Sequence, residues 1–206
     1  MTRHLLRDLF NVPNSLSIAR ILVTPLLPVC WFTLDSPALG LMLGLFVGIT
    51  DLLDGVIARK LNQVTEIGAL LDQLGDLIFE STVLLIAVVD GRLWMGWLLI
   101  YLFREFLVST VRIWVNAKGA SLPSSWIGKA KSSLMQYGFF LFFLGAILTH
   151  PSSTPNVQPL LGISPGLFVL EGGTFSIVLG ILVGLFSGAQ YLRSFAAIYE
   201  NHRSVR

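Results

Sequence analysis

Apolar residues fall in six long runs along this chain, and each run is close to the length that a helix needs to cross a bilayer. About 20 mostly apolar residues span the hydrocarbon core of a membrane. The runs cover residues 16–34, 38–58, 69–89, 93–115, 132–149 and 174–198. The pattern predicts an all-α integral membrane protein, with six transmembrane helices in a single domain that covers residues 1–206.

The segments between the runs have the composition of turns and loops. Asp35-Ser36-Pro37 and Asp90-Gly91 predict tight turns. Residues 116–129 form a polar connection. Residues 150–173 contain four prolines and four glycines, which predicts an irregular extramembrane loop.

The first twelve residues predict a short helix that lies in the membrane interface. Four apolar side chains recur at helical spacing, with Arg3 and Arg7 on the opposite side. These apolar residues are Leu5, Leu6, Leu9 and Phe10. A signal peptide is the competing interpretation, but Pro25 and Pro28 interrupt the apolar run and no small-residue cleavage site follows.

Glycines recur every fourth residue in two of the predicted spans, at 40, 44 and 48 and at 180, 184 and 188. This spacing places them on one helix face, where small residues let helices pack closely in lipid. We expect these faces to pack within the chain. Contact with a second copy of the chain is the alternative.

The composition agrees with a membrane protein. Of the 206 residues, 54% are apolar and 13% are charged, and the mean hydropathy is +0.75. Soluble domains carry about 25% charged residues, so the charge deficit argues against a disordered chain, a nucleic-acid-binding arm or a typical cytosolic enzyme. The net charge of +2 is too small to imply a nucleic-acid partner. One cysteine, Cys30, excludes an intrachain disulfide.

The positions of the basic residues predict the orientation. Cytoplasmic ends of membrane proteins are enriched in Lys and Arg. The connections at 35–37, 90–92 and 150–173 contain one basic residue, Arg92, whereas the opposite ends contain nine. We expect both termini in the cytoplasm and the protein in a bacterial inner membrane.

Four aspartates interrupt the apolar pattern of the second and third spans. Asp51 and Asp54 are three residues apart, and Asp72 and Asp76 are four apart, so each pair shares a helix face. Each carboxylate within a membrane costs roughly 2.5–3.5 kcal/mol on insertion scales. The two spans are joined by a short hairpin, so we expect the two pairs to meet near the cytoplasmic end, where their site would face the cytoplasm.

Four carboxylates without histidine or cysteine form a site of hard oxygen ligands. Such a site suits Mg²⁺ or Mn²⁺, and two ions would largely offset the charge. Gly55, Ala58 and Gly68 leave space beside the site, and Arg59 offers a planar donor for phosphate. The alternatives are buried polar residues that bridge helices, or a path for cations.

This stretch resembles the signature of the CDP-alcohol phosphotransferase family. The matching pattern is Asp51-x2-Asp54-Gly55-x2-Ala58-Arg59-x8-Gly68-x3-Asp72-x3-Asp76. The resemblance implies a six-helix membrane enzyme, usually a homodimer, that transfers a phosphatidyl-type group from a CDP-linked donor to an alcohol and releases CMP.

The resemblance also implies roles for the signature residues. Asp51, Asp54 and Asp72 would bind the metal ions. Asp76 would lie near a metal and act as the general base on the acceptor hydroxyl. The CDP site would comprise Asp54, Gly55, Ala58, Arg59 and Gly68, with Arg59 on the diphosphate.

Basic residues of the fourth and fifth spans predict a site for an anionic acceptor. Arg104 lies near the middle of the fourth span, and Arg112 lies two turns closer to the cytoplasm. Lys129 and Lys131 begin the fifth span at the level of the aspartates. Together they would bind a phosphate monoester. The alternative is ordinary anchoring of cytoplasmic ends by positive charge, which is weakest for Arg104 because deep arginines are rarely incidental.

Several segments resemble the phosphatidylglycerophosphate synthase branch of the family. They include Asn11-Val12-Pro13-Asn14-Ser15-Leu16-Ser17-x2-Arg20, Asn62-Gln63-x-Thr65, Arg104-Glu105 with Ser109 and Arg112, and Ser125-Trp126-Ile127-Gly128-Lys129-x-Lys131. The resemblance implies transfer from CDP-diacylglycerol to glycerol 3-phosphate. Gln73 and Leu77 stand where that branch usually has Pro and Lys. Inositol, inositol phosphate, serine or phosphatidylglycerol therefore remain alternative acceptors.

Two other classes of function use the same residues differently. A cation transporter would use the aspartates as an ion path, but they cluster at one depth and do not step across the bilayer. A lipid-binding scaffold related to the enzymes would not need every signature position intact.

Overall fold

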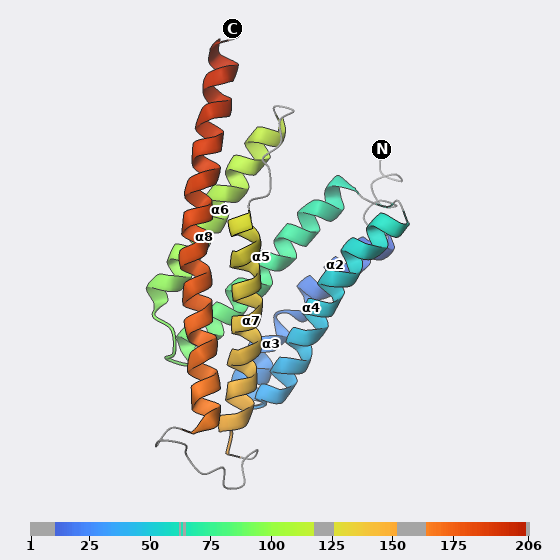
Figure 1. The fold of residues 1–206 in the computed structure, drawn as a ribbon. Coiled ribbons are helices and arrows are strands. Elements are labelled where there is room, and N and C mark those ends of the chain that lie inside the picture. Colours follow the sequence, from blue (N-terminus) through green and yellow to red (C-terminus); the bar gives the residue numbers. More distant parts are fainter. Residues whose placement is uncertain (1–10, 62, 64, 118–125, 152–163, 205–206) are drawn as a thin grey trace.

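The structure is a computed structural model, which describes residues 11–61, 63, 65–117, 126–151 and 164–204. Within these residues every regular element is a helix (Figure 1). The long helices are α4 (Pro37–Lys60), α5 (Glu66–Val89), α6 (Met95–Ala117), α7 (Trp126–Thr149) and α8 (Pro165–Ser204). The all-α prediction is confirmed for this part of the chain. The predicted interfacial helix at 1–12 falls almost entirely outside the described residues.

Four helical segments are long and apolar enough to cross a membrane: Val12–Thr33, Pro37–Lys60, Trp126–Thr149 and Pro165–Ala196. This composition is typical of an integral membrane protein. Helices α5 and α6 have a similar length, but each carries charged residues within its apolar stretch. These residues are Asp72, Asp76 and Glu80 in α5, and Arg104, Glu105 and Arg112 in α6. The two helices outside the apolar set are therefore those that carry several charged residues within their apolar stretches.

The first segment is not one continuous helix. It consists of α2 (Val12–Val23), α3 (Leu26–Pro28) and a π-helical turn, η1 (Val29–Thr33). Asn11 caps α2 by accepting a hydrogen bond from the backbone N–H of Asn14 at 2.8 Å. Helix α2 ends at Val23, just before Pro25, because a proline has no N–H to continue the hydrogen-bond ladder and clashes with the preceding turn. The predicted span at 16–34 thus corresponds to a helical segment that is interrupted near Pro25.

Both predicted tight turns are confirmed. Asp35 adopts a φ of 45°, and Gly91 adopts a φ of 73°. Gly91 tolerates this left-handed conformation because it has no Cβ. Ser36 then caps α4, since its hydroxyl oxygen accepts from the N–H of Leu39.

The prediction of an irregular loop at 150–173 is wrong for its second part. Helix α8 begins at Pro165, a position in the first helical turn where proline is tolerated. Gly173 lies within this helix, and a Cβ placed on it would be 2.5 Å from the backbone nitrogen of Phe142. The glycine therefore permits close contact between α7 and α8, which overrides its low helix propensity.

Helices α7 and α8 lie side by side along most of α7, while α2 packs against both α4 and α5 (Figure 1). The expectation of packing within the chain is confirmed for the glycine face of α8. A Cβ at Gly180 would be 3.0 Å from the Met135 side chain, and one at Gly188 would be 3.4 Å from Arg104. Gly48 on α4 differs, because a Cβ there would meet no atom within 4 Å.

A buried apolar cluster packs α5, α6, α7 and α8 against one another. It joins α5 and α7 through residues such as Val83, Leu84, Phe139 and Phe142, and Ile177 of α8 adds to it. Trp31 of η1 stacks on Phe142 with ring centroids 5.3 Å apart. In lipid, close van der Waals packing of such side chains holds helices together, because the surrounding acyl chains are equally apolar.

Candidate active site

Arg20 of α2 lies at the centre of the aspartate cluster. Its side chain is 1% exposed, and its guanidinium contacts the carboxylates of Asp51, Asp72 and Asp76. The Nη2–Oδ1 distance to Asp72 is 3.0 Å, and the Nη1–Oδ1 distance to Asp76 is 3.3 Å. Nη2 also donates to the backbone oxygen of Asp72 at 3.0 Å. A buried guanidinium at this point indicates that the three carboxylates form a cation-binding group.

The structure brings three of the four predicted aspartates together. One carboxylate oxygen from each of Asp51, Asp72 and Asp76 lies within 4.8 Å of the others. The side chains of Asp72 and Asp76 are 51% and 56% exposed, so the group is accessible despite the buried arginine. Spacing of this kind, with oxygen donors alone, fits a divalent cation of the Mg²⁺ type.

The fourth aspartate, Asp54, points to a different partner. It is 6% exposed, and its Oδ2 accepts a hydrogen bond from the hydroxyl of Ser17 at 2.8 Å. Ser17 and Arg20 are one turn apart on α2, as are Asp54 and Asp51 on α4. The two helices therefore pair Ser17 with Asp54 and Arg20 with Asp51 in register.

Gly75 makes room for the arginine. A Cβ at this position would lie 2.6 Å from Nε and 2.8 Å from Nη2 of Arg20. Nε is buried and has no hydrogen-bond partner among the described residues. Neither Gly75 nor Arg20 had a role in the sequence-based site. The available signal was a single arginine within an otherwise apolar run, which must find a carboxylate in lipid.

The small residues predicted for nucleotide binding lie on both sides of the hairpin between α4 and α5. A Cβ at Gly55 would be 3.6 Å from Nη1 of Arg59, so this exposed arginine folds back over the glycine. Ala58 follows on α4 and is partly buried. A Cβ at Gly68 would be 2.5 Å from Oδ1 of Asn14, so that glycine permits close approach of α2.

The same hairpin is tied to the start of α2 by side-chain hydrogen bonds. Asn14 Nδ2 donates to Thr65 Oγ1 at 3.2 Å, and Asn11 Nδ2 donates to the backbone oxygen of Gln63 at 3.4 Å. Thr65 also caps α5, because its hydroxyl oxygen accepts from the N–H of Gly68 at 3.0 Å. These contacts hold α2 in place, and α2 carries Arg20.

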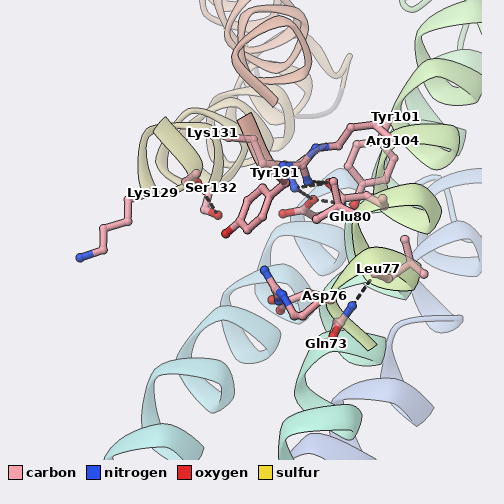
Figure 2. Close-up of a pocket in the computed structure, with 15 residues that line it drawn as sticks. Gln73, Asp76, Leu77, Glu80, Tyr101, Arg104, Lys129, Lys131, Ser132 and Tyr191 are labelled. Carbon is pink, nitrogen blue, oxygen red and sulfur yellow. Dashed lines mark hydrogen bonds and ion pairs between the residues drawn. The ribbon is translucent and has the colours of Figure 1, made fainter. Parts of the chain in front are cut away.

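A cavity of about 260 Å³ adjoins the aspartates between α5, α6, α7 and α8 (Figure 2). Asp76 lies on its wall, together with all four basic residues predicted for the acceptor. These are Arg104, Arg112, Lys129 and Lys131. The structure thus places the predicted base and the predicted anion-binding residues around one space.

Two of these basic residues are paired with carboxylates. Lys131 Nζ lies 2.8 Å from Glu80 Oε2 and 2.8 Å from Glu105 Oε1. Arg104 contacts Glu105 through Nη1, and its Nε donates to the backbone oxygen of Gly184 at 3.0 Å. Glu80 therefore pairs with Lys131, while Glu105 pairs with both Lys131 and Arg104. The network has two cations and two anions, so its charges cancel.

The other two basic residues have aromatic neighbours. Arg112 Cζ lies 5.7 Å from the centre of the Tyr191 ring, and Lys129 Nζ lies 5.5 Å from the centre of the Trp126 ring. Figure 2 shows the Lys129 side chain directed away from the group around Lys131. Among the described residues, neither Arg112 nor Lys129 has a carboxylate partner, so their charges are the least compensated in the cavity.

A second cavity, of about 310 Å³, meets the aspartates from the direction of α4 and α7. Arg20, Asp51 and Asp76 lie on its wall. The rest of the wall is largely apolar and includes Gly44, Gly48, Phe79, Phe139, Phe140 and Phe143. Asp76 and Glu80 belong to the walls of both cavities.

Comparisons with known proteins agree with this arrangement. A sequence model described as CDP-alcohol phosphatidyltransferase matches residues 10–172. The chain is 35% identical over 138 residues to the CDP-diacylglycerol–glycerol-3-phosphate 3-phosphatidyltransferase of Rickettsia felis, covering 66% of this chain and 76% of the relative. It is 29% identical over 168 residues to the protein of the same name from Escherichia coli K12, covering 68% of this chain and 89% of that relative. The matched residues include Arg20 and all four aspartates, and the chain belongs to the CDP-alcohol phosphatidyltransferase family.

Proposed function

We propose that this protein is an enzyme of phospholipid biosynthesis that transfers the phosphatidyl group of CDP-diacylglycerol to glycerol 3-phosphate. The products are phosphatidylglycerophosphate and CMP. The observation that carries the proposal is the convergence of Asp51, Asp72 and Asp76 beside a cavity with four basic residues on its wall. Membership of the family supports the class of reaction, and the names of the relatives support the acceptor.

We assign Asp51, Asp54, Asp72 and Asp76 as ligands for Mg²⁺ or Mn²⁺, with two ions bound. Oxygen ligands alone favour these hard cations. Ser17 contacts Oδ2 of Asp54, and Oδ1 is the oxygen that we assign to the metal site. When bound, the ions neutralise the pyrophosphate and stabilise the charge that develops on the leaving phosphate.

The donor would contact two parts of the protein. Asp54, Gly55, Ala58, Arg59 and Gly68 form the CDP site, with the planar guanidinium of Arg59 on the diphosphate. The apolar cavity along α4 and α7 would take the acyl portion of the lipid, because its wall is rich in phenylalanine and glycine. Its contact with Asp51 and Asp76 supports this assignment.

The acceptor phosphate would bind in the basic cavity, and we assign Arg104, Arg112, Lys129 and Lys131 to this site. Arg112 is the main phosphate ligand in this proposal, since its charge is not offset by a carboxylate among the described residues, and Lys129, the other such cation, is directed away from the group around Lys131. Arg104 and Lys131 share Glu80 and Glu105, so they contribute less net charge. A guanidinium can donate two parallel hydrogen bonds to a phosphate.

Asp76 is the general base in this proposal. Its carboxylate accepts the proton of the acceptor hydroxyl while the hydroxyl oxygen attacks the lipid-linked phosphorus of the donor. The bond between that phosphorus and the bridging oxygen breaks, and CMP leaves with the electron pair. The position of Asp76 on the walls of both cavities supports this role, because donor and acceptor must meet there.

We propose the same membrane setting that the sequence predicts. The chain would form one domain of six spans, with α5 and α6 among them, and residues 1–12 would lie in the interface. The first residue of α2 and the last turns of α8 lie toward the same end of the bundle (Figure 1), which supports two termini on one side. The basic ends favour the cytoplasm, and we propose a homodimer in a bacterial inner membrane.

The proposed function is tested with purified protein in detergent, CDP-diacylglycerol, Mg²⁺ and radiolabelled glycerol 3-phosphate. We expect labelled lipid and CMP in equal amounts, and loss of both after chelation of the metal. Inositol phosphate, inositol, serine and phosphatidylglycerol are supplied in parallel. If one of these gives lipid product and glycerol 3-phosphate does not, the proposed acceptor is wrong. Cation flux in liposomes without CMP release would instead favour a transporter.

A further inference from the structure

Gln73 and Ser109 form a hydrogen-bonded pair on the wall of the basic cavity. The amide nitrogen of Gln73 on α5 donates to the hydroxyl oxygen of Ser109 on α6. Both side chains are partly buried and both line the cavity of about 260 Å³. The pair belongs neither to the aspartate cluster nor to the network around Lys131, and the proposed chemistry gives it no role.

The pair adjoins the two groups that would hold the ends of the acceptor. Gln73 is three residues before Asp76 on α5, and Ser109 is three residues before Arg112 on α6, so each shares a face with its neighbour. Figure 2 shows Gln73 and Asp76 close together on α5. An acceptor with its reacting hydroxyl at Asp76 and its phosphate at Arg112 would therefore pass the pair.

The pair retains hydrogen-bonding capacity after its internal bond is made. Gln73 keeps a carbonyl oxygen and a second N–H, while Ser109 keeps its O–H donor. A single alcohol group can donate to the glutamine oxygen and accept from the serine at the same time. The pair is therefore matched to a hydroxyl, which is both a donor and an acceptor.

We propose that Gln73 and Ser109 are specificity residues that bind the hydroxyl on the central carbon of a three-carbon polyol phosphate. This inference rests on the proposed function, because it takes glycerol 3-phosphate as the acceptor. Asp76 binds the terminal hydroxyl that reacts, Arg112 binds the phosphate, and the pair binds the hydroxyl between them. The three contacts together fix which carbon carries the attacking oxygen.

The expected selectivity is moderate. A net hydrogen bond between neutral groups contributes about 0.5–1.5 kcal/mol, which corresponds to roughly 2- to 12-fold in rate or affinity. An acceptor that lacks the central hydroxyl leaves Gln73 and Ser109 bonded to each other, so neither group is left unpaired. We therefore expect a preference of about tenfold, well below the 10⁴-fold seen where buried polar groups are stranded.

The experiment compares glycerol 3-phosphate with 3-hydroxypropyl phosphate, which keeps the phosphate and the reacting hydroxyl but lacks the central one. CMP release gives kcat/KM for both acceptors with wild type, Gln73→Ala, Ser109→Ala and Thr110→Ala. Thr110 is the matched control, since it follows Ser109 on α6, is exposed, and donates to the backbone oxygen of Phe106. Thermal denaturation in detergent reports the stability of each variant.

We expect wild type and Thr110→Ala to prefer glycerol 3-phosphate by about tenfold. Gln73→Ala and Ser109→Ala should lose most of this preference, with little change for 3-hydroxypropyl phosphate. If the pair only joins α5 to α6, each substitution would instead lower kcat/KM equally for both acceptors, and that result overturns the proposal. If one variant fails to fold, the other gives the same ratio. No turnover of glycerol 3-phosphate by wild type would contradict the proposed function itself, and a wild type that does not discriminate would contradict only the pair.

Discussion

Arg20 on α2 donates to the carboxylate of Asp72 on α5 across 3.0 Å, although the residues are 52 positions apart in sequence. The same guanidinium reaches Asp51 on α4, so one side chain joins three helices at the proposed metal site. An arginine in this position offsets part of the charge of the carboxylates. It also competes with divalent cations for the same oxygens.

The first prediction concerns this arginine. Arg20→Ala leaves Asp51, Asp72 and Asp76 without a compensating cation, so we expect a lower stability in the absence of metal. Breaking a buried ion pair costs about 3–5 kcal/mol, and partial exposure of Asp72 and Asp76 places the expected loss near the lower end. Thermal denaturation in the presence of a chelator measures this loss of stability. The control is Arg193→Ala, at an exposed position.

Divalent ions should act more strongly on this variant than on the wild type. With the guanidinium gone, Mg²⁺ meets no competitor, and the increase in Tm on its addition should be larger for Arg20→Ala. An equal increase in both proteins would mean that Arg20 and the metal do not share oxygens.

The second prediction concerns Asp76. Asp76→Asn keeps the shape of the side chain but removes the basic oxygen, so CMP release should fall by about 10²-fold or more. Binding of CDP-diacylglycerol, measured by isothermal titration, should be largely retained. The control is Asp35→Asn, at the exposed turn that precedes α4. Near-normal turnover by Asp76→Asn would exclude it as the base.

The third prediction concerns the buried network around Lys131. Lys131→Met leaves Glu80 and Glu105 with only Arg104 as a cation, and we expect a loss of about 3 kcal/mol or more in stability. Adding Glu80→Gln should recover part of that loss, because the two residues are coupled. Lys129→Met serves as control for stability, as Lys129 is exposed. Strictly additive effects in the double variant would contradict direct pairing.

The fourth prediction concerns Gly75. Gly75→Ala places a methyl group 2.6 Å from Nε of Arg20, so the guanidinium must move, and overpacking typically costs about 1–3 kcal/mol. Gly172→Ala is the matched control, since it lies within α8 and a Cβ there meets no atom within 4 Å. The control should be neutral or stabilised, because alanine is the better helix former. Melting temperatures in detergent compare the stability of Gly75→Ala with that of Gly172→Ala, and an equal effect of both substitutions would contradict the prediction.

The convergence of Asp51, Asp72 and Asp76 could be predicted from sequence because it depends on local rules. Helical spacing puts Asp72 and Asp76 on one face, and a short hairpin returns them beside Asp51. The loop composition was less informative. Pro165 and Gly173 predict a break in a helix, but Pro165 is tolerated in the first turn of α8 and Gly173 permits close contact with α7. Tertiary packing there outweighed local propensity.

The partners of the charged residues could not be predicted in the same way. Arg20 meets carboxylates 31 to 56 positions away, and Lys131 meets Glu80 51 positions away. Such pairs depend on how three helices rotate about their axes, which no single helix encodes. Asp54 illustrates the point, because its bond to Ser17 follows from the register of α2 against α4.

The shared wall at Asp76 and Glu80 has a consequence for how the two substrates would travel. The apolar cavity approaches these residues from one side and the basic cavity from the other. Under the proposed function, a water-insoluble donor can stay within the bilayer throughout the reaction, and a highly polar acceptor can stay in water. The reacting carboxylate then stands at the boundary between two solvents, and neither substrate has to cross it.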